Sequence, residues 1–469
     1  TPELGYPCWA HPMGNTSSVA HHITGMIDGQ PQYPNSISRG TLEAFGAAPE
    51  ASFADVSAEP SGFPNRFYRR AICLADGPDG NVYALDIFRM AGGTTRTWCF
   101  HGPAHDAFDA SLEFTPTGEE RIELPNMGRG MESNIIEPAE ARADGDIQAD
   151  WAHDRTDLRL RLDVLGQPGR RYLTALCAKT DIPPIRYLFA EETGEDAASE
   201  FVSVWQPYTE EGGPFIERIE RLPVEGDAGE AEYAPVAVRV TLSGGQTDTF
   251  IYSLDPDAEL RVGEIEFSGS FGYWSEQDGR PRATHLVNGR YLRSGDAELT
   301  LAEPRIEATV TALDLAERTL TLDRDLPEGL DLTGRMVYVQ GGPHRSAYHV
   351  AEAPAPNVLR LDLSALRFRS RIEGFAEDGS HLIAELPPSI EVARGFKPGH
   401  YDGALITDET LQARYRVERV EDTKVFTDRP LNPADFTDAD GDGRAVFLIY
   451  DHGPGDSVTV QMNAFRRWE

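Results

Sequence analysis

The chain has 469 residues, 40% of them hydrophobic, which allows roughly two to four domains with ordinary apolar cores. It carries 43 lysines and arginines against 77 aspartates and glutamates, a formal net charge of −34. A surface this acidic repels nucleic-acid phosphates and anionic lipids, so we expect no nucleic-acid partner. No stretch has the apolar length of a membrane-spanning helix, so we also expect no membrane span.

The first residues carry neither an initiator methionine nor the basic start and apolar stretch of a signal peptide. We therefore expect a processed or partial polypeptide. The four cysteines show no CxxC or zinc-ribbon spacing; they are Cys8, Cys73, Cys99 and Cys177. This pattern favours buried free thiols, and one disulfide remains open if the protein is exported.

Short runs of alternating apolar and polar residues follow one another along the chain, and helical periodicity is nearly absent. Turn-forming residues recur about every 8–12 residues, which is typical of all-β sandwiches. Such runs include residues 82–88, 237–242, 249–254, 308–313, 319–322, 336–340, 358–363 and 445–450. We predict an all-β chain, with a large antiparallel β-sandwich in residues 1–268 and a smaller β-module in residues 269–469.

Several connections can be predicted from their composition. Residues 76–80 (Asp-Gly-Pro-Asp-Gly) and 243–246 (Ser-Gly-Gly-Gln) are typical of hairpin turns. Residues 126–150 are rich in Gly, Glu, Asp and Ala and poor in β-branched residues, which predicts a long surface excursion. The acidic stretch 225–232 predicts an exposed loop. The domain boundary is placed near residues 269–279, because the strands after it become shorter and more regular.

Three residues near the start have side chains suited to proton transfer. Tyr6 lies in a Gly-Tyr-Pro turn, where the proline restricts the tyrosine backbone to extended conformations and presents the phenol rigidly. His21 and His22 open an apolar run, in which strand alternation directs their rings to opposite faces. Phenol and imidazole suit the proton transfers that β-elimination of a uronic-acid polymer requires. Ordinary packing of a loop tyrosine and of two histidines that bind no metal is the alternative explanation.

An ordered set of motifs links these residues to a known family. The Gly-Tyr-Pro turn at residues 5–7 is followed by His-Ile-Thr-Gly-Met-Ile-Asp-Gly at residues 22–29. Arg-Arg-Ala-Ile-Cys-Leu at 69–74, Asp-Ile-Phe-Arg before a Gly-Gly pair at 86–93, and Phe-His-Gly at 100–102 come next. The set resembles the opening of the carboxyl-terminal β-domain of heparinase II/III-type polysaccharide lyases. The resemblance covers about the first 260 residues, with isoleucine at position 23 where that family usually has asparagine.

The resemblance implies a lyase that cleaves an acidic, uronic-acid-containing polysaccharide in the periplasm or outside the cell. It implies that Tyr6 reaches the substrate and that His22 ligates a zinc ion. In that family an N-terminal helical toroid domain shares the site, and the other zinc ligands lie upstream, in an HxH and an Asp-Pro-Gly segment. This chain contains neither, so we expect a missing toroid domain or subunit and no lyase activity from the chain alone.

An acidic polysaccharide requires a locally basic groove on so acidic a protein. Five arginines lie close enough in sequence to supply one, although for most of them scattered surface positions are the better explanation; they are Arg66, Arg69, Arg70, Arg89 and Arg96. Within this region His21, His101 and Arg89 are our candidates for substrate binding. The alternative for His101 is a histidine at a strand end that bonds a nearby backbone carbonyl.

A possible calcium site lies near the other end of the chain. Asp438, Asp440 and Asp442 alternate with small residues, like the acidic half of a calcium loop. The twelfth position, where an EF-hand has glutamate, is isoleucine, so Asp435 or Asp451 would have to close the site. An Asp/Gly-rich hairpin turn explains the same pattern without a metal.

Two functions of other classes compete with the lyase hypothesis. A carbohydrate-binding or structural β-module without a catalytic role predicts no bound zinc and a glycan affinity that survives Tyr6→Phe and His22→Ala. An accessory domain of a glycoside hydrolase is the other possibility. The six tryptophans are dispersed along the chain and form no evident aromatic platform, which argues only weakly against it.

Overall fold

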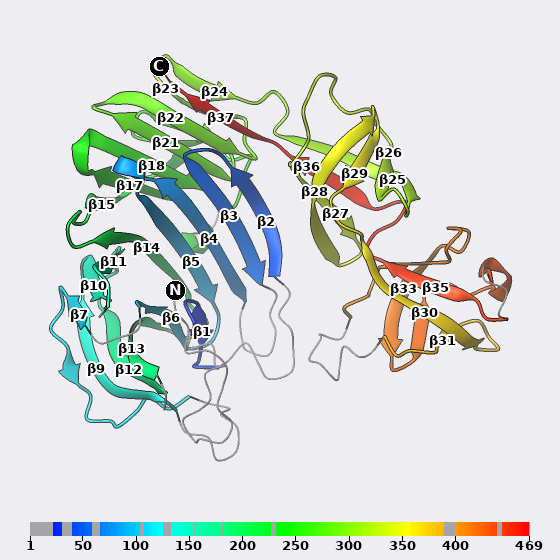
Figure 1. The fold of residues 1–469 in the computed structure, drawn as a ribbon, viewed down its shortest axis with the longest axis horizontal. Helices are drawn as coiled ribbons and strands as arrows, with labels where there is room; N and C mark the ends of the chain where they lie inside the picture. The colour runs from blue at the N-terminus through cyan, green and yellow to red at the C-terminus, as the bar shows by residue number, and fades with distance from the viewer. Residues whose placement is uncertain are drawn as a thin grey trace. The chain divides into compact units, whose positions relative to one another are not determined.

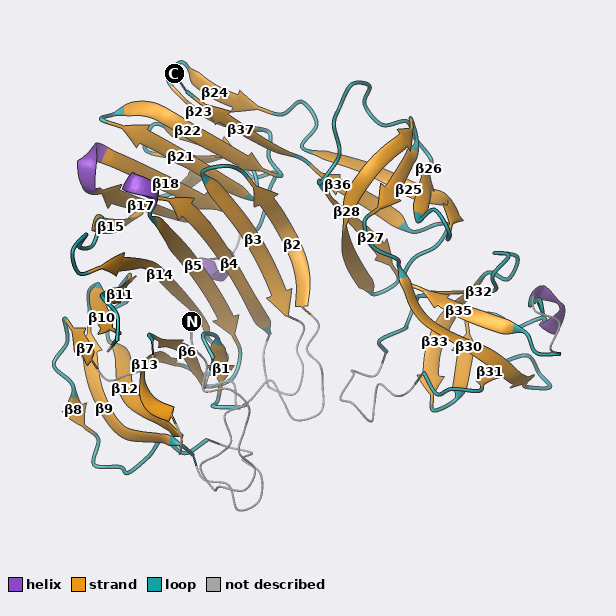
Figure 2. Ribbon diagram, in the orientation of Figure 1, coloured by secondary structure: helices purple, strands orange, loops and turns teal. Residues whose placement is uncertain are grey.

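The computed structural model describes residues 22–30, 40–58, 66–103, 107–124, 133–153, 155–179, 182–226, 231–388, 399–438 and 443–468. These residues form antiparallel strands and short 3-10 turns, without an α-helix (Figures 1 and 2). The predicted all-β class is therefore confirmed. None of the helical turns in the described ranges has the length and apolarity to cross a membrane.

The first compact unit contains the described residues up to 302 together with those from 463 onward. Its first two sheets are built mainly from the N-terminal half of the chain. Sheet A has the order β1 (Gly25–Ile27), β6 (Thr95–His101), β13 (Ile182–Thr193), β12 (Arg170–Lys179), β9 (Ile135–Ala143), β8 (Thr115–Pro116). Sheet B has the order β2 (Gly40–Ala47), β3 (Ala51–Ala58), β4 (Phe67–Asp76), β5 (Val82–Ala91), β14 (Ala198–Thr209), β11 (Leu158–Val164), β10 (Ile147–Ala152), β7 (Ala107–Ala110).

Two further sheets complete this unit. Sheet C has the order β15 (Ile216–Leu222), β17 (Val236–Leu242), β18 (Gln246–Tyr252), β21 (Phe271–Gln277), β22 (Arg280–Val287), β37 (Asn463–Arg467). Sheet D has the order β16 (Glu225–Gly226), β19 (Leu260–Val262), β20 (Ile265–Ser268), β23 (Tyr291–Ser294), β24 (Ala297–Thr300). Three buried apolar clusters join sheet A to B, B to C and C to D, so the unit is a stack of four layers.

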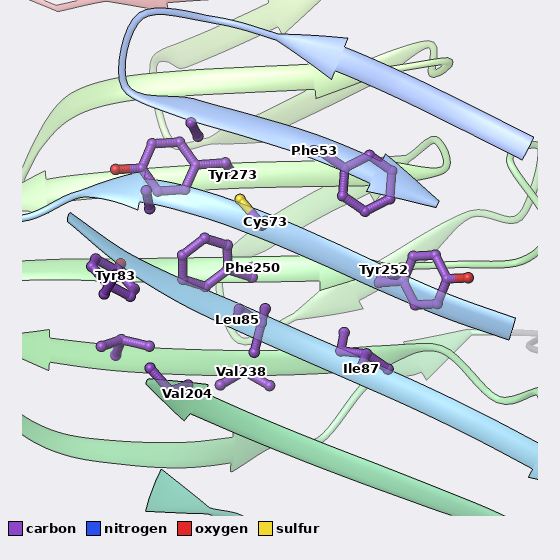
Figure 3. Packing of buried hydrophobic residues seen from close by; sticks show 14 of the residues in the cluster. Phe53, Cys73, Tyr83, Leu85, Ile87, Val204, Val238, Phe250, Tyr252 and Tyr273 are labelled. Atoms are coloured by element: carbon purple, nitrogen blue, oxygen red, sulfur yellow. The ribbon is translucent and has the colours of Figure 1, made fainter. Parts of the chain in front are cut away.

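Sheet B is covered on both faces, and the sequence of β5 reflects this. Nine of its ten residues are buried, because alternate side chains pack against sheet A and sheet C. Leu85 and Ile87 join the cluster shared with sheet C, which is drawn in Figure 3, while Phe88 and Met90 join the cluster shared with sheet A. A strand buried on both sides reads as a nearly continuous apolar run, as this one does.

The two predicted hairpin turns are confirmed by 3-10 turns, at Pro78–Gly80 between β4 and β5 and at Ser243–Gly245 between β17 and β18. The surface excursion expected at residues 126–150 is wrong for the part that the structure describes. Here β9 enters sheet A and β10 enters sheet B. Partner strands supply the hydrogen bonds and apolar contacts that this Ala- and Glu-rich composition does not suggest by itself.

The division into units also differs from the expected boundary after residue 268. That position falls between β20 and β21, and β21 pairs with β18 inside sheet C. The last strand, β37, returns to pair with β22 at the edge of the same sheet. The first unit is therefore discontinuous in sequence, and the second holds residues 303–462. The expectation of buried free thiols is confirmed for Cys73, Cys99 and Cys177, whereas Cys8 lies outside the described residues.

The second unit contains two closed six-stranded barrels. The first has the order β25 (Arg305–Asp314), β26 (Thr319–Leu322), β29 (Val358–Leu361), β28 (His344–Ala355), β27 (Met336–Gly341), β36 (Ser457–Gln461). The second has the order β30 (Leu366–Phe375), β31 (His381–Ala384), β34 (Lys424–Thr427), β33 (Tyr415–Glu421), β32 (Leu405–Thr407), β35 (Val446–Tyr450). The second barrel is inserted between β29 and β36, and Arg416 of β33 pairs with Asp456 at the junction, at 2.8 Å.

His452 lies buried at the same junction, two residues after the end of β35. Its ring is 2% exposed and sits edge-on to the rings of Tyr348 and Tyr450, at centroid distances of 5.6 and 5.7 Å. Neither ring nitrogen has a hydrogen-bond partner. Burial disfavours the imidazolium and lowers the pKa of His452 from 6.5 to about 4. The folded protein therefore holds a neutral histidine that the unfolded chain protonates more readily.

We predict that this histidine weakens the second unit as the pH falls. Between pH 6.5 and about 4 the unfolded chain binds a proton that the folded chain does not, so stability declines by up to about 3 kcal/mol. In urea unfolding, His452→Phe should gain stability over the parent protein progressively across this window, because it keeps the ring packing and cannot titrate. The half-exposed His349, changed to Gln, is the control. A difference between His452→Phe and parent that is constant with pH would contradict the prediction.

Candidate functional site

The start of β1 and the end of β6 meet at one edge of sheet A. The antiparallel register pairs Gly25 with Trp98 and Ile27 with Arg96, and the Cys99 amide donates to the Thr24 carbonyl at 2.7 Å. His22 lies three residues before β1, in a bend, and His101 is the last residue of β6, so both belong to the same end of this strand pair. We call this end of the β1–β6 pair the histidine edge.

Strand alternation assigns His101 to the outer face of sheet A, away from sheet B. Its neighbour Phe100 packs between the two sheets, whereas Cys99 belongs to the cluster on the outer face. Tyr187 of β13 is paired with His101, and their ring centroids are 4.8 Å apart. The Nδ1 atom of His101 lies 2.9 Å from the Gly102 carbonyl oxygen, which only accepts. In the neutral ring Nδ1 therefore carries the proton, and Nε2 is the acceptor nitrogen.

Side chains from sheet B hold the segment that presents His22. The Tyr68 hydroxyl donates to the Gly25 carbonyl at 2.8 Å and lies 3.0 Å from the Thr24 hydroxyl. Arg70 donates to the Ile23 carbonyl at 2.7 Å. The glycine is required here, because a Cβ at position 25 would lie 2.3 Å from the sulfur of Met90. Contacts from β4 and β5 thus fix the backbone on which His22 stands.

Arg70 is itself fixed by a buried carboxylate. Its Nε and Nη2 atoms donate to the two oxygens of Asp86 at 2.9 and 2.7 Å, and the Asp86 side chain is 0% exposed. A bidentate pair of this kind orients the guanidinium in its own plane. The position of the His22 segment therefore depends on an ion pair within sheet B.

The Asp-Gly pair after β1 connects the motif at residues 22–29 to the turn that follows the Gly-Gly pair at residues 92–93. Asp28 and Gly29 have positive φ angles of 54° and 62°. One carboxylate oxygen of Asp28 accepts from the amides of Thr94 and Thr95, at 2.7 and 2.8 Å. The Gly-Gly turn between β5 and β6 allows this contact, because a Cβ at position 93 would lie 2.6 Å from the other oxygen of Asp28.

The remaining candidates from the sequence are not all brought to the histidine edge. Tyr6 and His21 lie outside the described residues. Arg89, 3% exposed, lies on the opposite face of sheet B, with Nε 2.7 Å from Glu200 and the guanidinium over the Tyr252 ring. Arg89 is thus occupied by a buried ion pair between sheets B and C.

The expectation of a basic groove from five neighbouring arginines is wrong. Each guanidinium meets an acceptor within the protein, and the partners lie in different parts of the sheets. The contacts are Arg66 with Glu232 and Asp196, Arg69 with Asp55, Arg70 with Asp86, Arg89 with Glu200, and Arg96 with Ser199 and the Gly194 carbonyl. Four of these arginines pair with carboxylates, Arg96 bonds a hydroxyl and backbone carbonyls, and the five do not form one basic surface.

The metal hypotheses can be compared with the side chains that the structure describes. Zinc requires three or four converging ligands, and nowhere in the described ranges do three His, Cys, Asp or Glu side chains form such a group. These residues do not by themselves make a zinc site, and His22 would supply one ligand.

For calcium, Asp440 and Asp442 lie outside the described residues, and Asp438 accepts from the Gly443 amide at 2.8 Å. The two possible closing ligands have other partners, because Asp435 bonds the Tyr415 hydroxyl and Asp451 pairs with Arg367.

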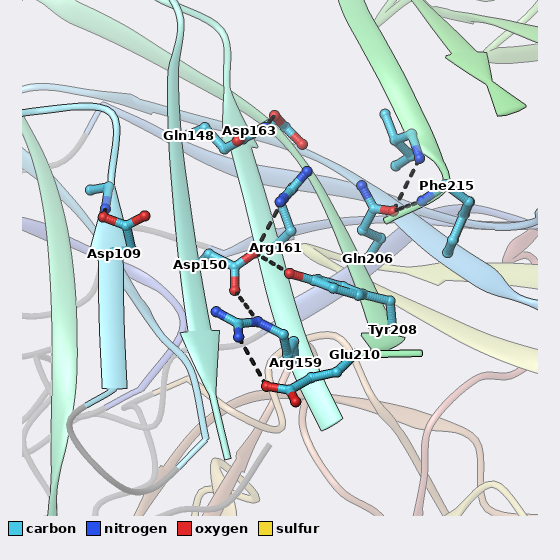
Figure 4. Close-up of polar contacts among 12 residues, drawn as sticks. Asp109, Gln148, Asp150, Arg159, Arg161, Asp163, Gln206, Tyr208, Glu210 and Phe215 are labelled. Atoms are coloured by element: carbon cyan, nitrogen blue, oxygen red, sulfur yellow. Dashed lines mark hydrogen bonds and ion pairs between the residues drawn. The ribbon is translucent and has the colours of Figure 1, made fainter. Parts of the chain in front are cut away.

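The structure adds one polar pocket that the sequence analysis missed. It opens on sheet B and is lined by Asp109, Asp150, Arg159, Arg161 and Tyr208, among others (Figure 4). The sequence feature that could have indicated this pocket is the strict alternation of Leu-Arg-Leu-Arg-Leu-Asp-Val at residues 158–164. This pattern predicts a strand with one apolar and one charged face. Its partners on β10, β14 and β7 could not be inferred from that strand alone.

Comparison with known proteins finds similarity only among solved structures. No family model matches the chain, and no curated protein matches it. A heparinase III with methylated lysines is 11% identical over 54% of this chain and 34% of its own, with a TM-score of 0.35. Another heparinase III structure is 12% identical over 54% and 33%, with a TM-score of 0.33.

The heparan sulfate lyase HepC from Pedobacter heparinus is 16% identical over 48% of this chain and 29% of its own, with a TM-score of 0.27. The chain thus spans about a third of the length of the structures that it matches. These neighbours are of the kind that the sequence motifs resemble, and the relation is distant.

We predict that the Arg70–Asp86 pair is among the most sensitive points of the first unit. Arg70→Gln leaves a buried carboxylate without its cation, which should lower the free energy of unfolding by about 3–5 kcal/mol. Adding Asp86→Asn removes the orphaned charge and should recover part of the loss. The control is Arg66→Gln, because Arg66 is 37% exposed and its partners Asp196 and Glu232 are 70% and 24% exposed, so the loss of these pairs should change little. Equal effects of Arg70→Gln and Arg66→Gln in urea unfolding would refute the role of burial.

Proposed function

We propose that this chain supplies the β-sandwich half of a polysaccharide lyase site that cleaves a uronic-acid-containing polysaccharide by β-elimination. The observation that supports the proposal is the pairing of β1 with β6, because His22 lies three residues before β1 and His101 ends β6 at the same edge of sheet A. Both belong to the motifs that resemble heparinase II/III-type lyases. An exported location, in the periplasm or outside the cell, is part of the same proposal.

The chemistry explains why such residues belong at a shared edge. A uronate loses its C5 proton only when the neighbouring carboxylate is neutralised, a base takes the proton and an acid protonates the leaving oxygen. In the proposal, Tyr6 serves as the proton-transferring or substrate-orienting phenol. His101 lines the groove, with its Nδ1 held by the Gly102 carbonyl and Nε2 as the acceptor. His21 contributes to substrate binding.

The outer face of sheet A offers room for a ligand near these residues. A cavity of about 340 Å³ is lined there by side chains that include Met26, Thr97, Leu173 and Phe189. Asp28, Glu123 and Glu191 also line it, so an acidic polymer bound there requires cations from outside the described residues. Thr97 is four residues from His101 along β6, a distance of about 13 Å. Thr97 lines the cavity, whereas His101 is 1% exposed, so in the proposal the polymer meets Thr97 first and contacts His101 only after its cover is displaced. Arg89 is excluded from this part of the proposal, because its guanidinium is buried on the opposite face of sheet B.

The catalytic base and the groups that neutralise the carboxylate are proposed to come from a helical toroid domain or subunit. The five arginines that could have done so have partners within the chain. Zinc belongs to the proposal with His22 as one ligand, and the remaining ligands would come from outside the described residues. A bound zinc ion would orient the His22 ring and keep the histidine edge rigid.

We predict that the isolated chain binds uronic-acid polymers through the histidine edge. Its affinity, measured by calorimetry, should fall about tenfold with His22→Ala or Tyr6→Phe, and also when the carboxylates of the polymer are reduced. The matched control is His349→Ala in the second unit. Affinity that survives both substitutions would favour the non-catalytic carbohydrate-binding module.

We further predict that the isolated chain forms no unsaturated uronate from these polymers, because the base is supplied elsewhere. The ultraviolet absorbance of the product is the measurement. An increase in absorbance with the chain alone would show that the complete site lies within it and would overturn the proposed division of the site.

A further inference from the structure

One end of sheet B carries charged residues on the face that is turned away from sheet A. In β10 and β11, Ala149, Trp151 and Leu160 pack toward sheet A, so Asp150 and Arg159 project from the opposite face. Sheet C covers that opposite face only in part. Its shared cluster takes residues from β2, β3, β4, β5 and β14 and, among the described residues, none from β11, β10 or β7. A pocket of about 500 Å³ opens over the remaining strands.

The strand register aligns polar side chains from neighbouring strands along the base of this pocket. Asp109 of β7 is paired with Asp150 of β10, which is paired with Arg161 of β11, which is paired with Gln206 of β14. A single row therefore crosses four strands. Two carboxylates directly opposite each other destabilise a sheet unless cations offset their repulsion.

Asp150 receives that compensation. The Nε atoms of Arg159 and Arg161 donate to its two oxygens at 3.0 and 3.2 Å, and the Tyr208 hydroxyl donates to it as well (Figure 4). Burial, with the hydrogen bond to Asp150, raises the pKa of Tyr208, so the hydroxyl keeps its proton. Arg159 also donates to Glu210 at 3.2 Å. The two guanidinium groups, 29% and 22% exposed, are thus held in fixed positions at the pocket wall.

The same residues retain capacity for further hydrogen bonds. Arg161 donates through Nε, while its two terminal nitrogens meet no acceptor within the ranges described here. A guanidinium has five donors in a rigid fork. The Asp109 carboxylate accepts from the Ala110 amide at 3.0 Å and has no cation partner in the described part of the chain. The row therefore presents a fixed donor and a fixed acceptor to the pocket.

The charges select against an acidic ligand. Three carboxylates line the pocket, from Asp109, Asp150 and Glu210, against the two guanidinium groups of Arg159 and Arg161. The chain as a whole carries −34. A uronate or sulfated sugar would be repelled, whereas neighbouring hydroxyls of a neutral sugar can each donate to Asp109 and accept from Arg161. The pocket volume lies within the range of small-ligand sites.

We propose that this pocket binds a neutral sugar residue of a glycan, with Asp109 and Arg161 as its principal contacts. The site does not depend on the proposed lyase function, since it lies on the opposite side of sheet B from the histidine edge. A chain with both sites would hold a polymer through its neutral units at one face and its uronic-acid units at the other.

The experiment measures binding of the full chain to a glycan array that contains neutral, uronic-acid and amino-sugar oligosaccharides, followed by calorimetry with the strongest neutral binder. We expect Asp109→Ala and Arg161→Met each to weaken that binding at least about tenfold. The controls are Glu307→Ala and Arg280→Met, exposed residues in other strands. The unfolding midpoint of Asp109→Ala should stay unchanged or rise, because the substitution removes the repulsion from Asp150.

The outcomes separate this proposal from the lyase proposal. His22→Ala should leave the neutral-sugar affinity unchanged, and Asp109→Ala should leave the affinity for uronic-acid polymers unchanged. Failure of every neutral glycan to bind would overturn the neutral-sugar assignment, as would binding that survives both pocket substitutions. Binding confined to amino sugars would also overturn it, because the excess of carboxylates would then select a cation.

Discussion

Burial of the central strands of sheet B on both faces is the constraint on which the first unit depends. A central strand such as β5 has no exposed face, so each charged side chain on it must find a partner inside the stack. Asp86 meets Arg70 on the side of sheet A, and Arg89 meets Glu200 on the side of sheet C. The first pair also fixes the segment before β1, so the geometry of the histidine edge is a consequence of how sheet B neutralises its own charges.

Local patterns predicted much of the fold, and non-local pairing explains most of what they missed. Apolar alternation identified runs such as residues 82–88, and glycine-rich turns identified both hairpins. The boundary of the first unit could not be predicted from local patterns, because β37 returns from the end of the chain to pair at the edge of sheet C. The strands β9 and β10 were missed because their stability comes from partners in two different sheets.

For the candidate site, too, local motifs identified individual residues, whereas their spatial arrangement depends on non-local strand pairing. His22 and His101 could be selected as residue types from their motifs, but their position at the same end of one strand pair follows from the pairing of β1 with β6, about 70 residues further along the chain. The expectation of a basic groove was wrong because sequence proximity among arginines says nothing about their carboxylate partners. Glu200, for example, lies 111 residues from Arg89. The pocket around Asp150 was missed for the same reason, since its arginines and its carboxylates come from separate strands.

The negative charge of the chain opposes binding of an acidic polymer at the histidine edge but does not oppose binding of a neutral sugar in the pocket over β7 and β10. The chain carries −34, and of the five arginines considered for a basic groove four form internal ion pairs and Arg96 donates to Ser199 and backbone carbonyls. A uronic-acid polymer therefore binds there only if cations outside the described residues offset this charge, whether they come from the rest of this chain, from a metal or from a partner domain. The pocket over β7 and β10 has no such requirement, because a neutral sugar carries no charge to be repelled. Binding of a neutral glycan needs only the preformed Asp150 network, whereas binding of an acidic one needs a second source of positive charge.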